Sequence, residues 1–199
     1  MMKPMRLLVF RVLCAAALAA ASLAAQETAL QIDPSQTKVG FTLGDVLHTV
    51  HGSFALKRGN IRFDPASGKA SGELVVDAAS GNSGSPGRDR RMHQNILESA
   101  KFPEIVFRPD RVGGKIGAHG TSHVELHGTF AIHGAEHEML LPVLVEAMGD
   151  HYAATLHFTV PYVRWGMKNP STLILRVSDK VEIDIETVAW PQTRTAEAR

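Results

Sequence analysis

Apolar and polar residues alternate one by one over much of this chain, and that alternation restricts the folds open to it. In the clearest run, Val181, Ile183 and Ile185 are separated by acidic residues. Successive side chains of a strand point to opposite faces of a sheet, so this run predicts a strand with one buried and one solvated face. Similar runs recur at residues 39–43, 123–133, 154–160 and 173–177. Strands of this kind are typical of antiparallel sheets.

Short segments rich in glycine, proline and polar residues separate the alternating runs. They are residues 57–60, 64–68, 112–114, 133–136 and 148–150. Such segments are typical of turns, and their spacing indicates about eight to ten strands joined as hairpins. The sequence shows no recurrent helical pattern that would carry parallel crossovers. It therefore predicts an all-β barrel or sandwich, and we favour a closed barrel because closure removes exposed strand edges.

One segment departs from the alternation. Residues 80–87 form a serine- and glycine-rich loop, and residues 88–99 have the pattern of a short helix. Ser85 is placed to cap this helix, with Pro86 at its first position. Met92 and Ile96 are four residues apart and form one thin apolar stripe on it. We expect a single short helix that covers the mouth of the barrel or flanks its side.

The first 24 residues have the composition of a secretory signal peptide. A basic start is followed by an apolar stretch at 12–21 and by small residues that place a cleavage site before Ala25. The uncharged run is about fifteen residues long, short of the roughly 20 that a membrane-spanning helix needs, so we expect no stable membrane span. Cys14, the single cysteine, lies in the segment to be removed. The sequence thus predicts a periplasmic or secreted protein after cleavage of residues 1–24.

Residues 25–199 show no linker or shift of composition. We expect them to form a single domain with a core at about 30–188 and a short polar C-terminal tail. The whole chain holds 21 basic and 20 acidic residues. A protein that binds nucleic acid would show a marked basic excess, so we expect no nucleic-acid partner. Without Lys3, Arg6 and Arg11 the balance becomes mildly acidic, 18 basic residues against 20 acidic ones.

Several stretches of the chain resemble the YceI-like family, exported lipocalin-like proteins associated with binding polyisoprenoid lipids. In chain order, similar stretches lie at 32–41, 48–54, 61–65, 161–170 and 175–177. The most specific match runs through the predicted helix and beyond it: Arg88-Asp89, Met92-His93, Leu97-Glu98-Ser99 and Lys101-Phe102-Pro103-Glu104-Ile105, with Phe107. Together these stretches extend over essentially all of residues 32–186.

The resemblance implies an up-and-down antiparallel, lipocalin-like barrel of about eight strands around an elongated apolar tunnel. It also implies a carrier that holds an isoprenoid lipid or an isoprenoid quinone without catalysis and without a further cofactor. The candidate tunnel wall is Phe41, Leu43, Phe54, Phe107, Leu126, Phe130, Leu156, Phe158 and Trp165. For Trp165, gating the tunnel and plugging one end of the barrel are equally acceptable interpretations. A homodimer is compatible with all of this.

Ten histidines make metal binding the first alternative. His123 and His127 lie four residues apart on one predicted strand, roughly 13 Å at the rise of a strand, which is too far for one metal ion. His133 and His137 flank a tight turn and are weak metal-ligand candidates. We favour a solvated histidine face. The alternatives kept open are a histidine-mediated metal-binding protein and a stress-related periplasmic interaction protein with a filled barrel.

Sequence motifs give little support to enzymatic chemistry. The serine-rich residues 80–85 contain no Gly-x-Ser-x-Gly elbow, and the glycine pair within 112–114 precedes no helix that would hold a phosphate. We therefore predict no catalytic residue and no enzymatic activity. The basic cluster at 88–91 is interpreted as a solvated helix start, with contact to an anionic lipid headgroup as the alternative.

Overall fold

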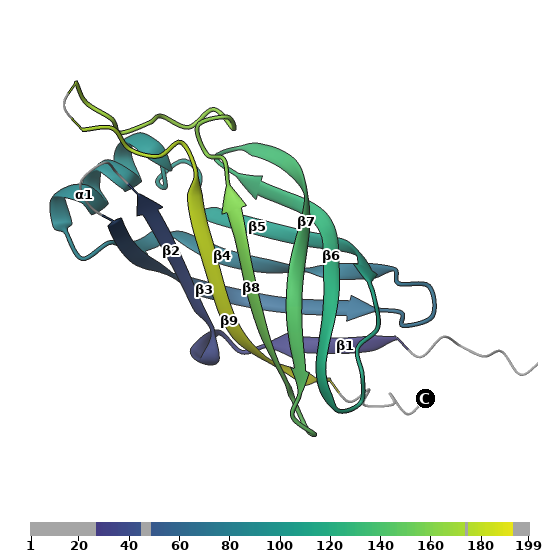
Figure 1. Cartoon of the computed structure of the whole chain (residues 1–199). Coiled ribbons are helices and arrows are strands. Elements are labelled where there is room, and N and C mark those ends of the chain that lie inside the picture. The colour runs from purple at the N-terminus through teal and green to yellow at the C-terminus, as the bar shows by residue number, and fades with distance from the viewer. Residues whose placement is uncertain (1–26, 45–48, 174, 193–199) are drawn as a thin grey trace, which may run out of the picture.

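Nine strands and three short helical segments make up the computed structural model, which describes residues 27–44, 49–173 and 175–192 (Figure 1). The strands are β1 (Thr28–Ile32), β2 (Lys38–Gly44), β3 (Thr49–Phe63), β4 (Ala70–Asn82), β5 (Glu104–Gly113), β6 (Gly120–Ile132), β7 (Ala135–Ala147), β8 (Tyr152–Val160) and β9 (Val181–Pro191). The helical segments are η1 (Pro34–Gln36), α1 (Pro86–Arg91) and η2 (Met92–Ile96). The predicted signal peptide at 1–24, with Cys14, lies outside the described residues, as does most of the C-terminal tail.

All nine strands belong to one antiparallel sheet that closes on itself. From β2 onward each strand pairs with the next, and β9 pairs back with β2. β1 and β2 pair with the same two neighbours, β3 and β9, at successive positions, so together they occupy one place in the barrel. The result is a closed up-and-down barrel of eight strand places plus one extra strand. It confirms the predicted lipocalin-like fold.

The alternation of the sequence separates the inside of the barrel from the outside. In β8, Leu156, Phe158 and Val160 are buried, and the residues between them are exposed. β6 and β7 repeat this pattern over most of their length. Among the described residues, the clustered apolar core begins at Leu30 and ends at Ala189. Burial of this apolar face is the main free-energy term that favours folding.

α1 and η2 connect β4 to β5 at one end of the barrel, called the helix end from here on (Figure 1). The loop at 161–180, between β8 and β9, lies at the same end. The helical segment begins at Pro86 as predicted, but regular helix stops at Ile96 rather than continuing to residue 99. Glu98, with a φ of 47°, adopts the left-handed conformation that ends helices.

The N-terminal cap of α1 differs from the predicted one. Ser85 stands at the cap position, but its side chain makes no capping hydrogen bond. The carboxylate of Asp89 instead accepts a 2.8 Å hydrogen bond from the backbone N–H of Ser83. An acidic side chain in the first turn of a short helix thus fastens the preceding loop rather than the helix terminus itself.

Within the residues that the structure describes, no helix is both long and apolar enough to cross a membrane.

Candidate ligand-binding cavity

The barrel encloses a cavity of about 540 Å³ toward its helix end. This volume lies within the range of ligand pockets, about 300–1,000 Å³. Side chains of β2, β8 and β9 line much of it, and η2 and the 161–180 loop complete the lining at the helix end. Most of the lining is aliphatic or aromatic; the polar side chains among the described residues are Ser83, Arg88, Arg91 and Tyr162. Such a space selects a ligand mainly by width and length.

Five of the nine predicted tunnel-wall residues line this cavity: Phe41, Leu43, Phe54, Phe130 and Phe158. The rings of Phe41 and Phe54 lie 5.4 Å apart, centroid to centroid. Those of Phe130 and Phe158 lie 6.2 Å apart, edge to face. These distances are typical of favourable aromatic pairs. Four aromatic rings from four strands therefore form part of one apolar wall.

Phe107, Leu126 and Leu156 also point inward but lie outside the cavity lining. Each lies farther from the helix end than a lining residue of its own strand: Ile105 on β5, Phe130 on β6 and Phe158 on β8. There they belong to the closely packed core cluster. The structure therefore separates the predicted wall into a lining group and a packed group.

Sequence reasoning missed the lining that comes from outside the strands. Met92 and Ile96 of η2 line the cavity, together with Met167, Leu175 and Val177 from the 161–180 loop. The apolar stripe of Met92 and Ile96 was a signal for this lining, because an apolar face of a helix is expected to pack against another apolar surface. The alternation at 173–177 predicted a strand, and that prediction was wrong: Leu175 and Val177 belong to the loop between β8 and β9, and they line the cavity from there.

The residues that carried the family resemblance in the helix mostly fasten it to the barrel. The guanidinium of Arg88 donates to the hydroxyl and to the backbone carbonyl of Ser83, at 2.8 Å each. The Nε2 atom of His93 lies 2.9 Å from the backbone carbonyl oxygen of Gly81. The hydrogen bonds with Ser83 hold the pKa of Asp89 below its ordinary value. This helical segment is thus fixed over the cavity by several independent bonds.

The loop at 161–180 is fastened in a similar way. The hydroxyl of Tyr162 donates a 2.7 Å hydrogen bond to the backbone carbonyl of Ser178, and the N–H of Ser178 donates to Gly44 at the end of β2. Burial raises the pKa of Tyr162 to about 12, with the nearby charge of Asp179 as a second cause. The phenol is therefore a permanent donor at neutral pH, and the loop is held against the cavity mouth.

Trp165 stacks on His137, in the part of β7 that is not paired with β8. The pairing of β7 with β8 ends at Val143, next to Pro142, which has no N–H to extend the ladder. Trp165 contacts Phe130 at a centroid distance of 5.8 Å and stacks on His137 at 4.0 Å with nearly parallel planes. Trp165 is not part of the cavity lining. Its position favours a packing role in the wall.

His133 and His137 do not converge on a common point. The Nε2 atom of His133 lies 2.6 Å from a carboxylate oxygen of Glu98, which joins the β6–β7 turn to the end of the helical segment. His137 is stacked on Trp165, and its buried Nε2 atom has no hydrogen-bond partner among the described residues. Within residues 27–44, 49–173 and 175–192, no cluster of three or more potential ligands could hold a metal ion.

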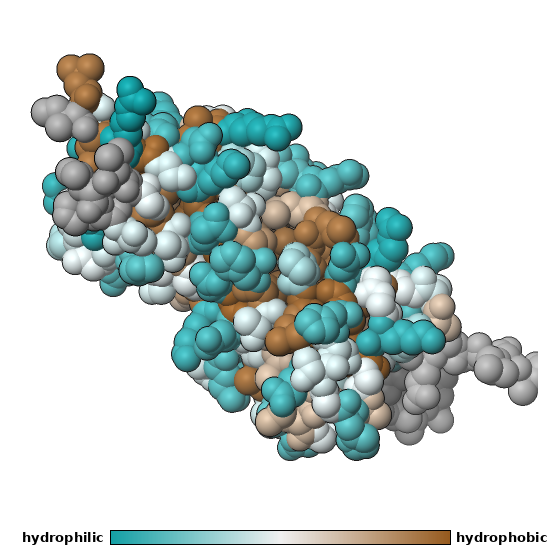
Figure 2. All heavy atoms as spheres, in the orientation of Figure 1, coloured by the Kyte–Doolittle hydropathy of each residue, from teal (hydrophilic) through white to brown (hydrophobic). Residues whose placement is uncertain are grey.

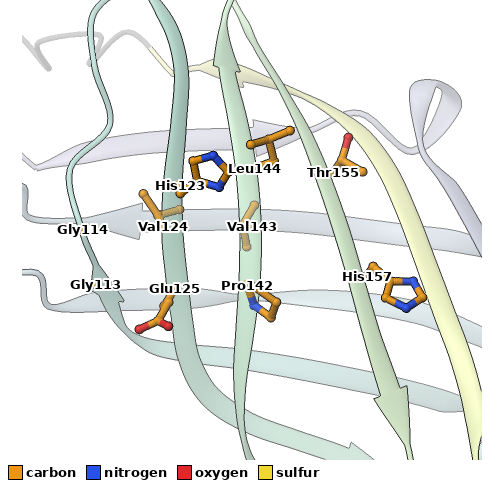
Figure 3. Close-up of a pocket in the computed structure, with 10 residues that line it drawn as sticks. All are labelled: Gly113, Gly114, His123, Val124, Glu125, Pro142, Val143, Leu144, Thr155 and His157. Atoms are coloured by element: carbon orange, nitrogen blue, oxygen red, sulfur yellow. The ribbon is translucent and has the colours of Figure 1, made fainter.

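A second hollow, of about 560 Å³, lies on the outer face over β6, β7 and β8 (Figure 3). Figure 3 shows His123 on β6 and His157 on β8, with β7 between them. Both side chains belong to exposed residues, as do Leu144 and Thr155 in the same hollow. An open hollow with exposed walls removes little ligand surface from water, so the enclosed cavity is the stronger candidate site.

His157 is the group in this hollow whose protonation the structure affects most clearly. Its Nδ1 atom lies 2.6 Å from a carboxylate oxygen of Asp184, and its Nε2 atom lies 3.4 Å from Glu182. The hydrogen bond with Asp184 raises the pKa of His157 above 6.5, and the negative charges of Asp184 and Glu182 act in the same direction.

We expect this pair to make stability depend on pH. Because the folded pKa of His157 is raised, its contribution is complete below pH 6.5 and is lost as the pH rises through the folded pKa. In an NMR titration, Asp184→Asn should lower the pKa of His157, and the variant should lose part of the stability gained on acidification. Glu138→Gln, on the outer face of β7, is the control. An unchanged His157 titration in Asp184→Asn would contradict the assignment.

A closed up-and-down barrel around an apolar cavity defines a lipocalin-like class of protein. Within that class, the model of the YceI-like domain family matches residues 30–189, and the chain belongs to this family. No curated protein matches the chain in sequence.

Three solved structures illustrate the shared fold. BcnA of Burkholderia cenocepacia is 18% identical, with a TM-score of 0.65; the match covers 79% of this chain and 98% of that one. A polyisoprenoid-binding domain from Saccharophagus degradans, implicated in plant cell wall breakdown, is 13% identical with a TM-score of 0.63, covering 82% and 98%. The YceI protein of Campylobacter jejuni is 21% identical with a TM-score of 0.58, covering 74% and 88%. At these identities the likeness concerns the fold.

Proposed function

We propose that this protein binds a long apolar isoprenoid chain, of the polyisoprenoid or isoprenoid-quinone type, and sequesters or carries it without chemical change. The observation that carries the proposal is the cavity of about 540 Å³ in the barrel interior, with its mostly apolar lining. The YceI-like family and the polyisoprenoid-binding domain from Saccharophagus degradans support a lipid ligand. Phe41, Leu43, Phe54, Phe130 and Phe158 are the predicted residues that we expect to contact the chain.

Burial of apolar surface supplies enough free energy for such binding. Each CH₂ group moved from water into an apolar space contributes about 0.8 kcal/mol. A few five-carbon units therefore give roughly 10 kcal/mol before the cost of association is subtracted. The lining offers few polar partners, and these lie toward the helix end, so we expect the chain to be held by shape and its polar head to lie near that end.

Catalysis and metal binding have no part in this proposal. Of the polar groups in the cavity lining, Ser83 is hydrogen-bonded with Arg88 and Asp89, and the hydroxyl of Tyr162 donates a hydrogen bond to the backbone carbonyl of Ser178. The predicted signal peptide at 1–24 places the carrier outside the cytoplasm, where it would transfer isoprenoids between membranes or protect them. Periplasm and external medium both fit this role.

The test is the lipid that copurifies with the protein. Residues 25–199 are expressed in a bacterial host, purified in a volatile buffer and examined by native mass spectrometry, followed by solvent extraction and lipid analysis. We expect one bound isoprenoid chain per barrel. A barrel that stays empty after incubation with polyprenols and isoprenoid quinones would overturn the proposal, and would favour the interaction-protein alternative.

A further inference from the structure

Basic side chains are concentrated at the helix end of the barrel. The helix α1 and the loop at 161–180 together hold seven basic and two acidic residues. The remaining described residues hold nine basic and sixteen acidic ones. A molecule with a small overall charge is therefore polarised, with a cationic helix end and an acidic body. The seven basic residues are Arg88, Arg90, Arg91, Arg164, Lys168, Arg176 and Lys180.

The basic residues of the helix end are exposed and are not neutralised by carboxylates within the described part of the chain. Elsewhere on the barrel, Lys38, Lys57, Arg58 and Arg108 each form a salt bridge with a glutamate. Of the seven, Arg88 uses its guanidinium for Ser83, which leaves six cations facing water. Such a cluster attracts an anionic surface.

The 161–180 loop, which holds four of these basic residues, also holds an exposed apolar residue. Leu173, in the 161–180 loop, is fully exposed, with a relative accessibility of 105%. Two hydrogen bonds join described residues of the loop on either side of Leu173: the N–H of Thr172 donates to the carbonyl of Leu175 at 2.8 Å, and the side-chain amide of Asn169 donates to the carbonyl of Val177 at 3.2 Å. Figure 2 shows apolar atoms that project at this end beside strongly hydrophilic ones. Exposed apolar residues next to basic ones are typical of proteins that bind at a membrane interface.

The same segments line the cavity. Arg91 belongs to α1, and Pro170, Leu175 and Val177 belong to the loop that carries Leu173. The cationic surface and the helix end of the cavity are therefore parts of one structure. A membrane or protein bound to the basic residues of the helix end would therefore lie next to the cavity.

We propose that the helix end docks on the surface of an anionic phospholipid bilayer. Arg90, Arg91, Arg164, Lys168, Arg176 and Lys180 contact the lipid headgroups, and Leu173 enters the interface between them. In this orientation the acidic body points away from the membrane, which fixes the direction of approach. The docking surface follows from charge and exposure, and it does not depend on the proposed lipid cargo.

Vesicle binding tests the proposal. Residues 25–199, which include the complete described core, are mixed with vesicles of pure phosphatidylcholine or of phosphatidylcholine with phosphatidylglycerol, and bound protein is measured by flotation. The first variant carries Arg90→Glu, Lys168→Glu and Arg176→Glu; the second carries Leu173→Ser. The matched control carries Lys69→Glu, Arg111→Glu and Lys115→Glu, three exposed residues remote from the helix end that change the net charge by the same amount.

We expect binding to the phosphatidylglycerol vesicles only, with strong weakening at high salt. Each basic residue near an anionic surface contributes about a fivefold factor, so the triple variant should lose roughly a hundredfold in partitioning. Leu173→Ser should lose several-fold, and the far-end control should keep most of its binding. Equal losses in the helix-end triple variant and in the control variant, equal binding to both vesicle types, or no binding at all would each overturn docking. Isoprenoid uptake from vesicle-free solution should be unchanged in the triple variant and in Leu173→Ser. This measurement separates failure of docking from failure of the proposed carrier function.

Discussion

A chain that carries both Leu43→Trp and Val181→Trp should lose its capacity for a long isoprenoid chain and still form the barrel. Both residues line the cavity, and both stand at the strand ends nearest the helix end. Two indole rings at these positions occupy the space through which a chain would enter. Exclusion of even one five-carbon unit, at about 0.8 kcal/mol per CH₂, is expected to weaken binding at least about a hundredfold.

The measurement is native mass spectrometry with geranylgeraniol, a chain of four isoprene units, together with thermal unfolding. The matched control is Leu140→Trp with Leu144→Trp, two residues on the outer face of β7 that are exposed to 55% and 40%. The control should bind as the unchanged protein does. Undiminished uptake in the cavity variant would contradict the assignment of the cavity. A large fall in its melting temperature would show that the space was already filled, because overpacking costs about 1–3 kcal/mol.

Gly128→Ala is expected to destabilise the barrel strongly. A Cβ atom at this position would lie 2.2 Å from the backbone oxygen of Arg108 and 2.8 Å from Cα of Pro109. Gly128 pairs with Pro109 in the β5–β6 ladder, next to an irregularity in its register. The opposing atoms are backbone, so they cannot move without breaking the ladder. We expect a loss of about 3 kcal/mol or more in the free energy of unfolding.

Urea unfolding compares Gly128→Ala with Gly113→Ala, another β5–β6 glycine. A Cβ atom at Gly113 meets nothing closer than 3.7 Å. The control should be neutral or slightly stabilised, since alanine restricts the unfolded chain more than glycine does, by about 0.4–1 kcal/mol. Similar midpoints for the two variants would show that the close approach at Gly128 is not a constraint on the fold.

The strand pattern was the part of the fold that could be predicted best. Burial favours one apolar face on every strand, and the sequence shows this as apolar and polar residues that alternate with a period of two. The antiparallel strands and the inward direction of Phe41, Phe130 and Phe158 follow from it. The end of the helix was predicted three residues too late, because the left-handed backbone of Glu98 depends on its contact with His133 across the fold.

The candidate site could be predicted only in part. Phe107 and Phe130 pair directly across β5 and β6, and both are buried, yet only Phe130 lines the cavity. Pattern alone gives them the same role. They are register partners at one level of the barrel, so what distinguishes them is which of the two side chains borders the cavity, and only the three-dimensional arrangement of the surrounding segments decides that.

The sequence by itself determined which side chains point into this barrel and which point into water, because alternation along a strand is a local property of the backbone. Only the tertiary structure decided where the interior is packed and where it is hollow. That division depends on how far apart the facing strands stand, on the early end of the β7–β8 ladder at Pro142 and on the segments that cover the helix end. It also gathered basic residues from α1 and from a loop some seventy residues later into one surface around Leu173. Contacts between segments so distant in the chain leave no periodic trace in the sequence.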